Sequence, residues 1–162
     1  EGLDVELLDL HDYPIPYYDE AITPTQHKGD YNNEVVAKWA KKIAEADGFI
    51  IASPEYNHGY PAVLKSALDC IYHEWNQKAV GFVSWGSVGG GRAVEQLRQV
   101  AVELQMAPIR QSVHIMNPWT LNDESGKLKD GALDPYSNSA NMVLNQLAWW
   151  ATALKNARAI TK

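Results

Sequence analysis

Short apolar runs alternate with segments of helical spacing along almost the whole chain. This order constrains the fold more than any other feature. Alternation of this kind predicts an α/β protein with a parallel sheet and helices on both faces. Right-handed crossovers then give a doubly wound, three-layer α/β/α fold. The predicted strands are residues 5–10, 49–52, 79–83 and 109–115, and the helical patterns that follow them are residues 35–44, 62–69, 93–104 and 142–158.

The size and charge of the chain exclude several classes of protein. The 162 residues favour one domain over residues 1–162. With a net charge of -6 the chain lacks the excess of positive charge that nucleic-acid binding needs, so no nucleic-acid partner is expected. No apolar run approaches the ~18 residues of a membrane span, so no membrane partner is expected. The single cysteine, Cys70, excludes an intrachain disulfide and favours a cytoplasmic protein.

A long loop is predicted between the first two strands. Residues 13–30 carry prolines, tyrosines and Gly29, and their number exceeds the usual median of about 4–6 loop residues. Loops of this length are often functional. Asp30 and Asn32 are the candidates to cap the helix that follows.

The segment Ser53–Pro61 is polar and lies between a predicted strand and a helix that opens at Pro61. Open α/β sheets bind ligands at such strand ends. Its backbone groups would be free to bond the polar edge of a heterocycle, and Tyr56 would lie against a ring. An ordinary turn whose side chains cap the next helix explains the same residue types equally well.

A second strand-end loop, residues 84–92, contains four glycines and opens another helix. Glycine lets the backbone approach a ligand closely and adopt positive φ, and a helix N-terminus favours electronegative atoms. The spacing does not match the dinucleotide-binding fingerprint. A glycine-rich loop alone is equally consistent with a flexible turn, but two such loops on adjacent strands together indicate a flat ligand.

The polypeptide shows no chemistry of its own. No Gly-x-Ser-x-Gly elbow and no zinc-type Cys/His spacing occurs, so neither a catalytic nucleophile nor a metal site is predicted. His114 lies within a strand-like run, which indicates a structural role. The absence of a reactive constellation fits an enzyme whose cofactor performs the difficult step.

At these two loops the chain resembles the NAD(P)H-dependent FMN reductase family. The matching motifs are Ser-Pro-Glu-Tyr-Asn at residues 53–57, the helix Pro-Ala-Val-Leu-Lys-Ser-Ala-Leu-Asp at residues 61–69, and the glycine loop at residues 86–91. The resemblance implies a flavodoxin-like fold and bound FMN. It also implies hydride transfer from NADPH or NADH through FMN to a flavin, quinone or similar aromatic acceptor.

The resemblance also implies roles for individual residues. The first loop would border the isoalloxazine ring, and backbone N–H groups of the second would meet its pyrimidine edge and stabilise negative charge that develops there. The expected cofactor-binding residues are Pro54, Glu55, Tyr56, Asn57, Ser84, Trp85, Gly86, Gly89 and Gly90.

One part of the family pattern is not matched. The family opens with a strand and a phosphate-binding loop, and the sequence contains nothing like them. That strand is central in the family's sheet, so its absence would leave two interior strand edges unpaired. We therefore expect the natural protein to be longer at its N-terminus and the phosphate anchor to precede Glu1.

The surplus of large aromatic residues predicts self-association. Trp75, Trp119, Trp149 and Trp150 are too many for one small core. Trp149 and Trp150 are adjacent on a helix and point about 100° apart, so one is expected to face outward. The family forms dimers or tetramers, which implies a homodimer or homotetramer with Tyr72, Glu74 and Trp75 near a subunit contact. A monomer with a tryptophan-rich core is the alternative.

Two other function classes remain open. A flavodoxin-type electron carrier would bind FMN without nicotinamide turnover, and the acidic balance fits it, although the loops themselves are not especially acidic. A receiver-like signalling domain would need an acidic cluster at a strand end to hold Mg²⁺, and Asp9 and Asp12 match that poorly.

Overall fold

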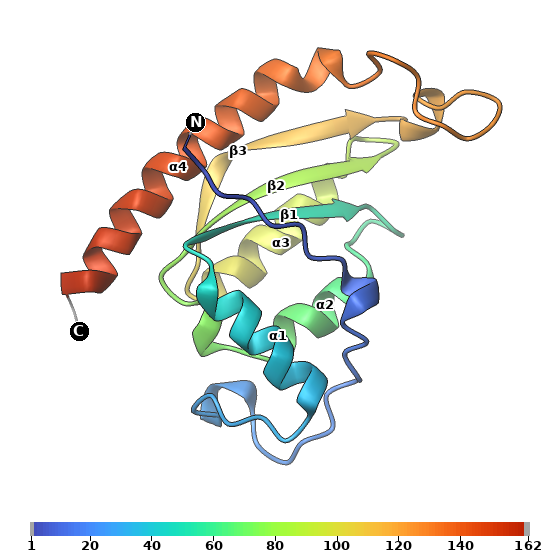
Figure 1. The fold of residues 1–162 in the computed structure, drawn as a ribbon. Helices are drawn as coiled ribbons and strands as arrows, with labels where there is room; N and C mark the ends of the chain where they lie inside the picture. Colours follow the sequence, from blue (N-terminus) through green and yellow to red (C-terminus); the bar gives the residue numbers. More distant parts are fainter. Residues whose placement is uncertain (1, 161–162) are drawn as a thin grey trace.

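The computed structural model describes residues 2–160 and shows a three-layer α/β fold (Figure 1). Three parallel strands form the central sheet in the order β1-β2-β3. Helices α1, α2 and α3 lie on one face and α4 on the other. The strands are β1 (Gly48–Pro54), β2 (Ala79–Gly86) and β3 (Ala107–Met116), and the helices are α1 (Glu34–Glu45), α2 (Ala62–Asp69), α3 (Gly91–Glu103) and α4 (Ser137–Ile160).

The strand predicted at residues 5–10 is wrong. Within the described residues this segment has only the short 3-10 turn η1 (Leu10–Asp12). A strand needs a neighbour to pair its backbone groups, and no strand of residues 2–160 pairs with this segment. Leu8 and Leu10 still pack against the core, and Lys42 of α1 donates a hydrogen bond to Glu6 at 3.0 Å. Side-chain contacts, not a β-ladder, therefore attach this segment.

The other predicted strands and helices are confirmed, most of them with longer bounds; α2 has the predicted bounds, and α3 begins two residues earlier and ends one residue earlier than predicted. The long loop is also confirmed, since residues 13–30 contain only the 3-10 turn η2 (Pro24–Gln26). The N-cap of α1 is Asn33 rather than Asp30 or Asn32. Its side-chain oxygen accepts hydrogen bonds from the amides of Val35 at 2.9 Å and Val36 at 3.2 Å. Asn33 thereby satisfies two of the amides that a helix start leaves without partners.

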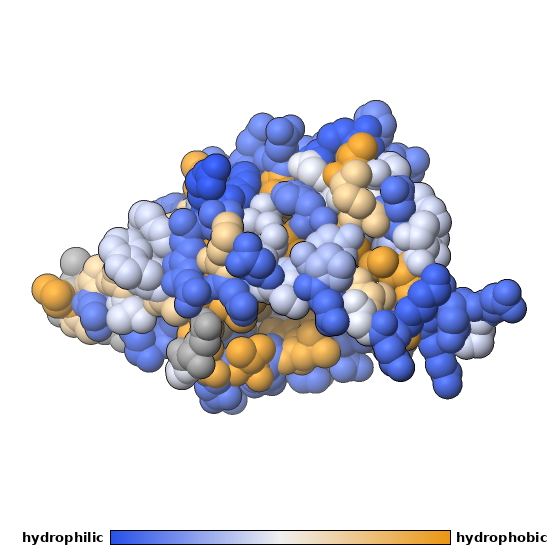
Figure 2. Space-filling model, turned by 90° about the horizontal axis from the view of Figure 1, so that it is seen from above, coloured by the Kyte–Doolittle hydropathy of each residue, from blue (hydrophilic) through white to orange (hydrophobic). Residues whose placement is uncertain are grey.

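Alternating side chains of the sheet point to its two covering layers. Val80 and Phe82 of β2 belong to the core beneath α1, α2 and α3, and Ala79 belongs to the smaller core beneath α4. Helix α4 packs mainly on β2 and β3, so Ile50 of β1 is left 40% exposed. From above, apolar side chains interrupt the hydrophilic surface (Figure 2). The sheet is thus fully covered on one face only.

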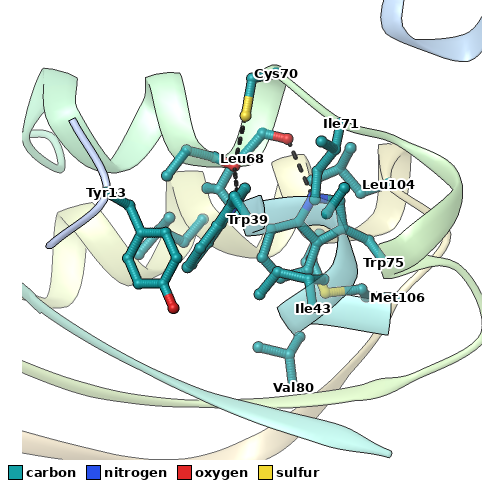
Figure 3. Close-up of a cluster of buried hydrophobic side chains, with 14 of the residues drawn as sticks. Tyr13, Trp39, Ile43, Leu68, Cys70, Ile71, Trp75, Val80, Leu104 and Met106 are labelled. Carbon is teal, nitrogen blue, oxygen red and sulfur yellow. Dashed lines mark hydrogen bonds between the residues drawn. The ribbon is translucent and has the colours of Figure 1, made fainter. Parts of the chain in front are cut away.

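The larger core is built around aromatic residues (Figure 3). Trp75 packs edge-to-face on Phe49 with ring centroids 4.9 Å apart, and on Trp39 at 6.0 Å. The indole N–H of Trp39 donates to the carbonyl of Ala67 at 2.9 Å, and that of Trp75 donates to Leu68 at 3.2 Å. These bonds satisfy buried indole donors and carbonyls near the end of α2. Trp75 is therefore a core residue.

Helix α4 presents aromatic residues to solvent. Trp149 is 66% exposed and Trp150 39% exposed, and their rings pack edge-to-face. Both residues thus face outward to different degrees, where one was expected to do so. Although α4 is 24 residues long, no helix within residues 2–160 is long and apolar enough to cross a lipid bilayer.

Candidate functional site

The two predicted loops lie side by side because β1 and β2 are adjacent parallel strands. Ser53 is in register with Ser84, and Pro54 with Trp85. The chain therefore leaves both strands at the same edge of the sheet. The amide of Glu55 donates to the carbonyl of Trp85 at 2.9 Å, which continues the pairing one residue beyond β1. This is the carboxyl edge, where open α/β sheets bind ligands.

The first loop folds back on itself in a tight turn. The amide of Tyr56 donates to the carbonyl of Gly59 at 2.8 Å, and the amide of Gly59 donates to Tyr56 at 3.0 Å. Asn57 and His58 between them have φ values of 49° and 71°. Two central residues with positive φ define a type I′ turn. The turn leaves the side chain of Tyr56 62% exposed at the edge of the sheet.

The second loop lies directly on the ends of β2 and β3. Gly90 has a φ of 73°, and a Cβ atom there would lie 2.6 Å from the Cβ of Ser84. Gly89 has a φ of 66°, and its Cβ would lie 2.8 Å from that of His114. Both positions require glycine for conformation and for space. Gly91, by contrast, has open space around it.

Ser84 and His114 support this loop from below. The hydroxyl of Ser84 donates to the carbonyl of Gly89 at 2.7 Å, and Nδ1 of His114 lies 3.0 Å from the same carbonyl. Nε2 of His114 lies 2.9 Å from the hydroxyl of Ser112. A carbonyl only accepts, so Nδ1 of His114 carries a proton and donates it to the Gly89 carbonyl. Ser84 is fully buried. A ligand would therefore contact the loop backbone above it and not its side chain.

An ion pair joins the first loop to α3. Oε1 of Glu55 accepts from Nε of Arg92 at 2.6 Å and pairs with Nη2, and Oε2 accepts from the Arg92 amide at 3.1 Å. The Glu55 side chain is only 4% exposed. Burial acts to raise the pKa of Glu55, but the hydrogen bonds and charge of Arg92 outweigh it and hold the pKa below its usual value. Glu55 is therefore a carboxylate.

Two further contacts tie the turn to α3. Nη1 of Arg92 lies 2.8 Å from Nε2 of His58, and the side-chain amide of Gln96 donates to the His58 carbonyl at 2.8 Å. Arg92 and Gln96 were not among the predicted site residues. They are four residues apart and so share one face of α3. The spacing of these two polar residues directly after the glycine loop was the sequence signal that could have identified them.

The second loop presents backbone donors. Within residues 2–160 the amides of Ser87, Val88 and Gly90 donate to no protein acceptor. Unpaired amides at a helix N-terminus suit electronegative atoms. With the exposed ring of Tyr56 nearby in the other loop, they fit the polar edge and face of a flat heterocycle. The residues present therefore fit a flavin ring, and the amides rather than the side chains carry that fit.

Two shallow grooves of the described surface lie elsewhere. One of about 500 Å³ runs along α4 beside Met142, Trp149 and Trp150, and one of about 510 Å³ adjoins Glu20 and Asn32. Neither reaches the strand-end loops. Geometry and unpaired donors, not concavity, identify the loops as the candidate site. Among the described residues, no cluster of His, Cys, Asp or Glu could hold a metal ion.

The sequence and fold match known flavin reductases. Residues 1–120 match the model of the NADPH-dependent FMN reductase family. The chain is 40% identical over 136 residues to the NAD(P)H-dependent FMN reductase of Schizosaccharomyces pombe, covering 83% of this chain and 64% of that protein. It is 34% identical over 158 residues to the NAD(P)H:quinone oxidoreductase of Solanum tuberosum, covering 95% of this chain and 77% of that protein.

A solved structure shares the fold. The flavoenzyme NAD(P)H:(acceptor) oxidoreductase FerB from Paracoccus denitrificans superposes with a TM-score of 0.65 at 19% identity, covering 96% of this chain and 83% of that chain. The fold is therefore flavodoxin-like. The chain spans less than two thirds of the length of the fission yeast relative.

Proposed function

The chain belongs to the NADPH-dependent FMN reductase family, and we propose that it binds FMN at the two strand-end loops. The activity we propose is hydride transfer from NADPH or NADH, through FMN, to a flavin, quinone or similar small aromatic acceptor. The observation that carries the proposal is the pair of linked loops at the carboxyl edge, with three amides of the glycine loop that have no acceptor within the described part of the chain.

The first loop would border the isoalloxazine ring. The exposed side chain of Tyr56 is available to lie against a flat ring, and the type I′ turn fixes Asn57 next to it. Glu55 faces α3 instead, so its part in binding is through its backbone and its charge. Pro54 ends β1 and sets the direction in which the loop leaves the sheet.

The second loop would receive the pyrimidine edge of the ring. Trp85 and Gly86 end β2, and Gly89 and Gly90 hold the backbone against Ser84. The amides are fixed before a ligand arrives, so they stabilise negative charge without reorganising. Bound FMN supplies the redox chemistry in this family, and the residues of this chain bind it, orient it and set the potential at its edge.

The acceptor and the assembly are parts of the same proposal. The potato relative is named as a quinone oxidoreductase, and the open edge beside Tyr56 suits planar aromatic acceptors. We propose a homodimer or homotetramer, supported by the exposed Trp119, Trp149 and Met142. A cytoplasmic location is proposed because the one cysteine, Cys70, is buried and forms no disulfide within residues 2–160.

The test combines flavin binding with anaerobic reduction. Purified full-length protein is titrated with FMN and followed by the flavin absorbance, and NADPH or NADH is then added without oxygen. We expect saturable binding, bleaching by nicotinamide and return of colour on adding a quinone. Bound flavin that neither nicotinamide reduces would instead indicate an electron carrier. Protein that takes up no FMN would refute the proposal.

A further inference from the structure

The carboxylate of Glu55 lies where the local positive potential would otherwise favour an electronegative group of a ligand. It lies at the first turn of α3, where it accepts from the amide and side chain of Arg92. A helix N-terminus and a guanidinium both produce positive potential. The exposed residues Ser87 and Val88, whose amides donate to no acceptor within residues 2–160, lie three to four residues before the start of α3. The protein therefore places a buried negative charge close to the donors proposed to meet the cofactor.

We infer that Glu55 is a positioning residue that holds the two loops together and lowers the positive potential at the proposed flavin edge. The inference rests on the proposed function. Glu55 follows β1 and Arg92 lies in α3, so their pairing fixes the distance between the loops. The negative charge of Glu55 offsets the positive charge of Arg92. The potential at the amides is then set mainly by backbone dipoles.

Opposite charge changes at the two residues should have opposite effects. Glu55→Gln keeps the size of the side chain and an oxygen that accepts from Arg92, but removes the negative charge. Arg92→Gln removes the positive charge and leaves Glu55 uncompensated. A reduced flavin carries more negative charge than an oxidised one at the edge facing the amides. Glu55→Gln should therefore favour the reduced cofactor, and Arg92→Gln the oxidised one.

The readout is the midpoint potential of bound FMN, measured by spectroscopic redox titration, together with the Kd of oxidised FMN. For Glu55→Gln we expect the ratio of reduced to oxidised affinity to rise about tenfold, a positive shift of about 30 mV for a two-electron couple. For Arg92→Gln we expect a negative shift of similar size. Glu55→Ala, which also removes the link between the loops, should additionally weaken oxidised FMN binding about tenfold.

A matched control lies at the opposite edge of the sheet. Asp47 accepts from Arg158 at 2.8 Å and pairs with Lys155 at 2.7 Å, so it also joins a loop to a helix through an Arg–carboxylate pair. Asp47→Asn removes the same charge far from the strand-end loops. It should leave both the midpoint potential and the Kd of FMN unchanged.

The outcomes separate this inference from the proposed function. Opposite shifts for Glu55→Gln and Arg92→Gln, with none for Asp47→Asn, support it. Shifts of the same sign, or values equal to those of Asp47→Asn, overturn it and leave Glu55 as a structural ion pair in a flavin-binding protein. If the unaltered protein binds no FMN, the proposed function fails and this inference fails with it. Should Glu55→Ala not fold, the two glutamine variants still decide the sign.

Discussion

The two edges of the sheet contain the same kind of ion pair, but the pairs serve different purposes. At the carboxyl edge, Glu55 and Arg92 join a loop to α3, and at the amino edge Asp47 and Arg158 join a loop to α4. Both pairs couple a carboxylate to a guanidinium across more than thirty positions of sequence. The difference lies in what each edge leaves unpaired.

At the amino edge the side-chain donors form hydrogen bonds with helix and loop carbonyls. Nζ of Lys78 donates to Ile43 at 2.7 Å and to Ala44 at 3.0 Å, and Arg158 donates to Gln77 at 2.6 Å. The carboxyl edge instead holds its loops through the contacts of Glu55 and Arg92, and the exposed residues Ser87 and Val88 keep amides that have no protein acceptor within residues 2–160. Satisfied groups stabilise the fold, whereas rigid groups without partners are available to a ligand.

The largest effect should follow from adding one methyl group at the carboxyl edge. Gly90→Ala places a Cβ atom only 2.6 Å from the Cβ of Ser84, at a φ of 73°. Steric overlap and backbone strain together should lower the free energy of unfolding by about 3 kcal/mol. The loop should also shift, so FMN binding is expected to be lost. Urea unfolding and FMN titration measure the two effects.

Gly91→Ala is the matched control, because the space around Gly91 is open. Its free energy of unfolding should stay within about 0.5 kcal/mol of the original, and FMN should bind as before. If Gly90→Ala binds FMN normally, the tight contact between this loop and β2 is not what positions the proposed ligand.

The contrast between the edges was only partly visible in the sequence. Apolar periodicity identified three strands, four helices and both loops, because each depends on local pattern. The Glu55–Arg92 pair joins residues 37 positions apart, and no periodicity reports such a contact. The type I′ turn was hidden because Asn57-His58 lacks the glycine that usually marks it. Residues 5–10 have a strand-like pattern, but a strand forms only where a neighbour pairs with it.

The amino edge should be recognisable by its pH dependence. Burial and the nearby charge of Arg158 lower the pKa of Lys78 from 10.5 to about 8. Between these values the unfolded chain binds more protons than the folded one, so stability rises with pH. The gain is complete above pH 10.5, decreases as the pH falls from 10.5 to 8, and is absent below pH 8. It amounts to about 1.4 kcal/mol per pH unit at most, or about 3 kcal/mol in all.

Lys78→Met removes this titration. Urea unfolding at several values between pH 7 and 10 should show the free energy of the original protein rising relative to that of the variant. Other groups titrate in both proteins, so the difference between them isolates Lys78. A constant difference across this range would mean that Lys78 is not held at a depressed pKa, and the amino edge would then not be the tightly satisfied region described above.

The smallest effect concerns residues with positive φ, which occur at both edges. Gln105 follows α3 with a φ of 55°. The amide of Met106 donates to Ala101 at 2.8 Å and that of Gln105 donates to Val102 at 3.0 Å. This is a Schellman motif with glutamine where glycine is usual. Gln105→Gly relieves strain but loses an exposed hydrogen bond to Tyr72, so we expect a gain of about 0.5 kcal/mol.

His58→Gly makes the equivalent change at the carboxyl edge and turns Asn57-His58 into the favoured Asn-Gly pair. It relieves strain at a φ of 71° but removes the contact with Arg92. Its effect on the free energy of unfolding should be similarly small. FMN affinity should change for His58→Gly and not for Gln105→Gly, because only the first alters a loop proposed to contact the ring. Equal FMN affinities for both variants would show that strain at the carboxyl edge has no more to do with ligand binding than strain at the amino edge.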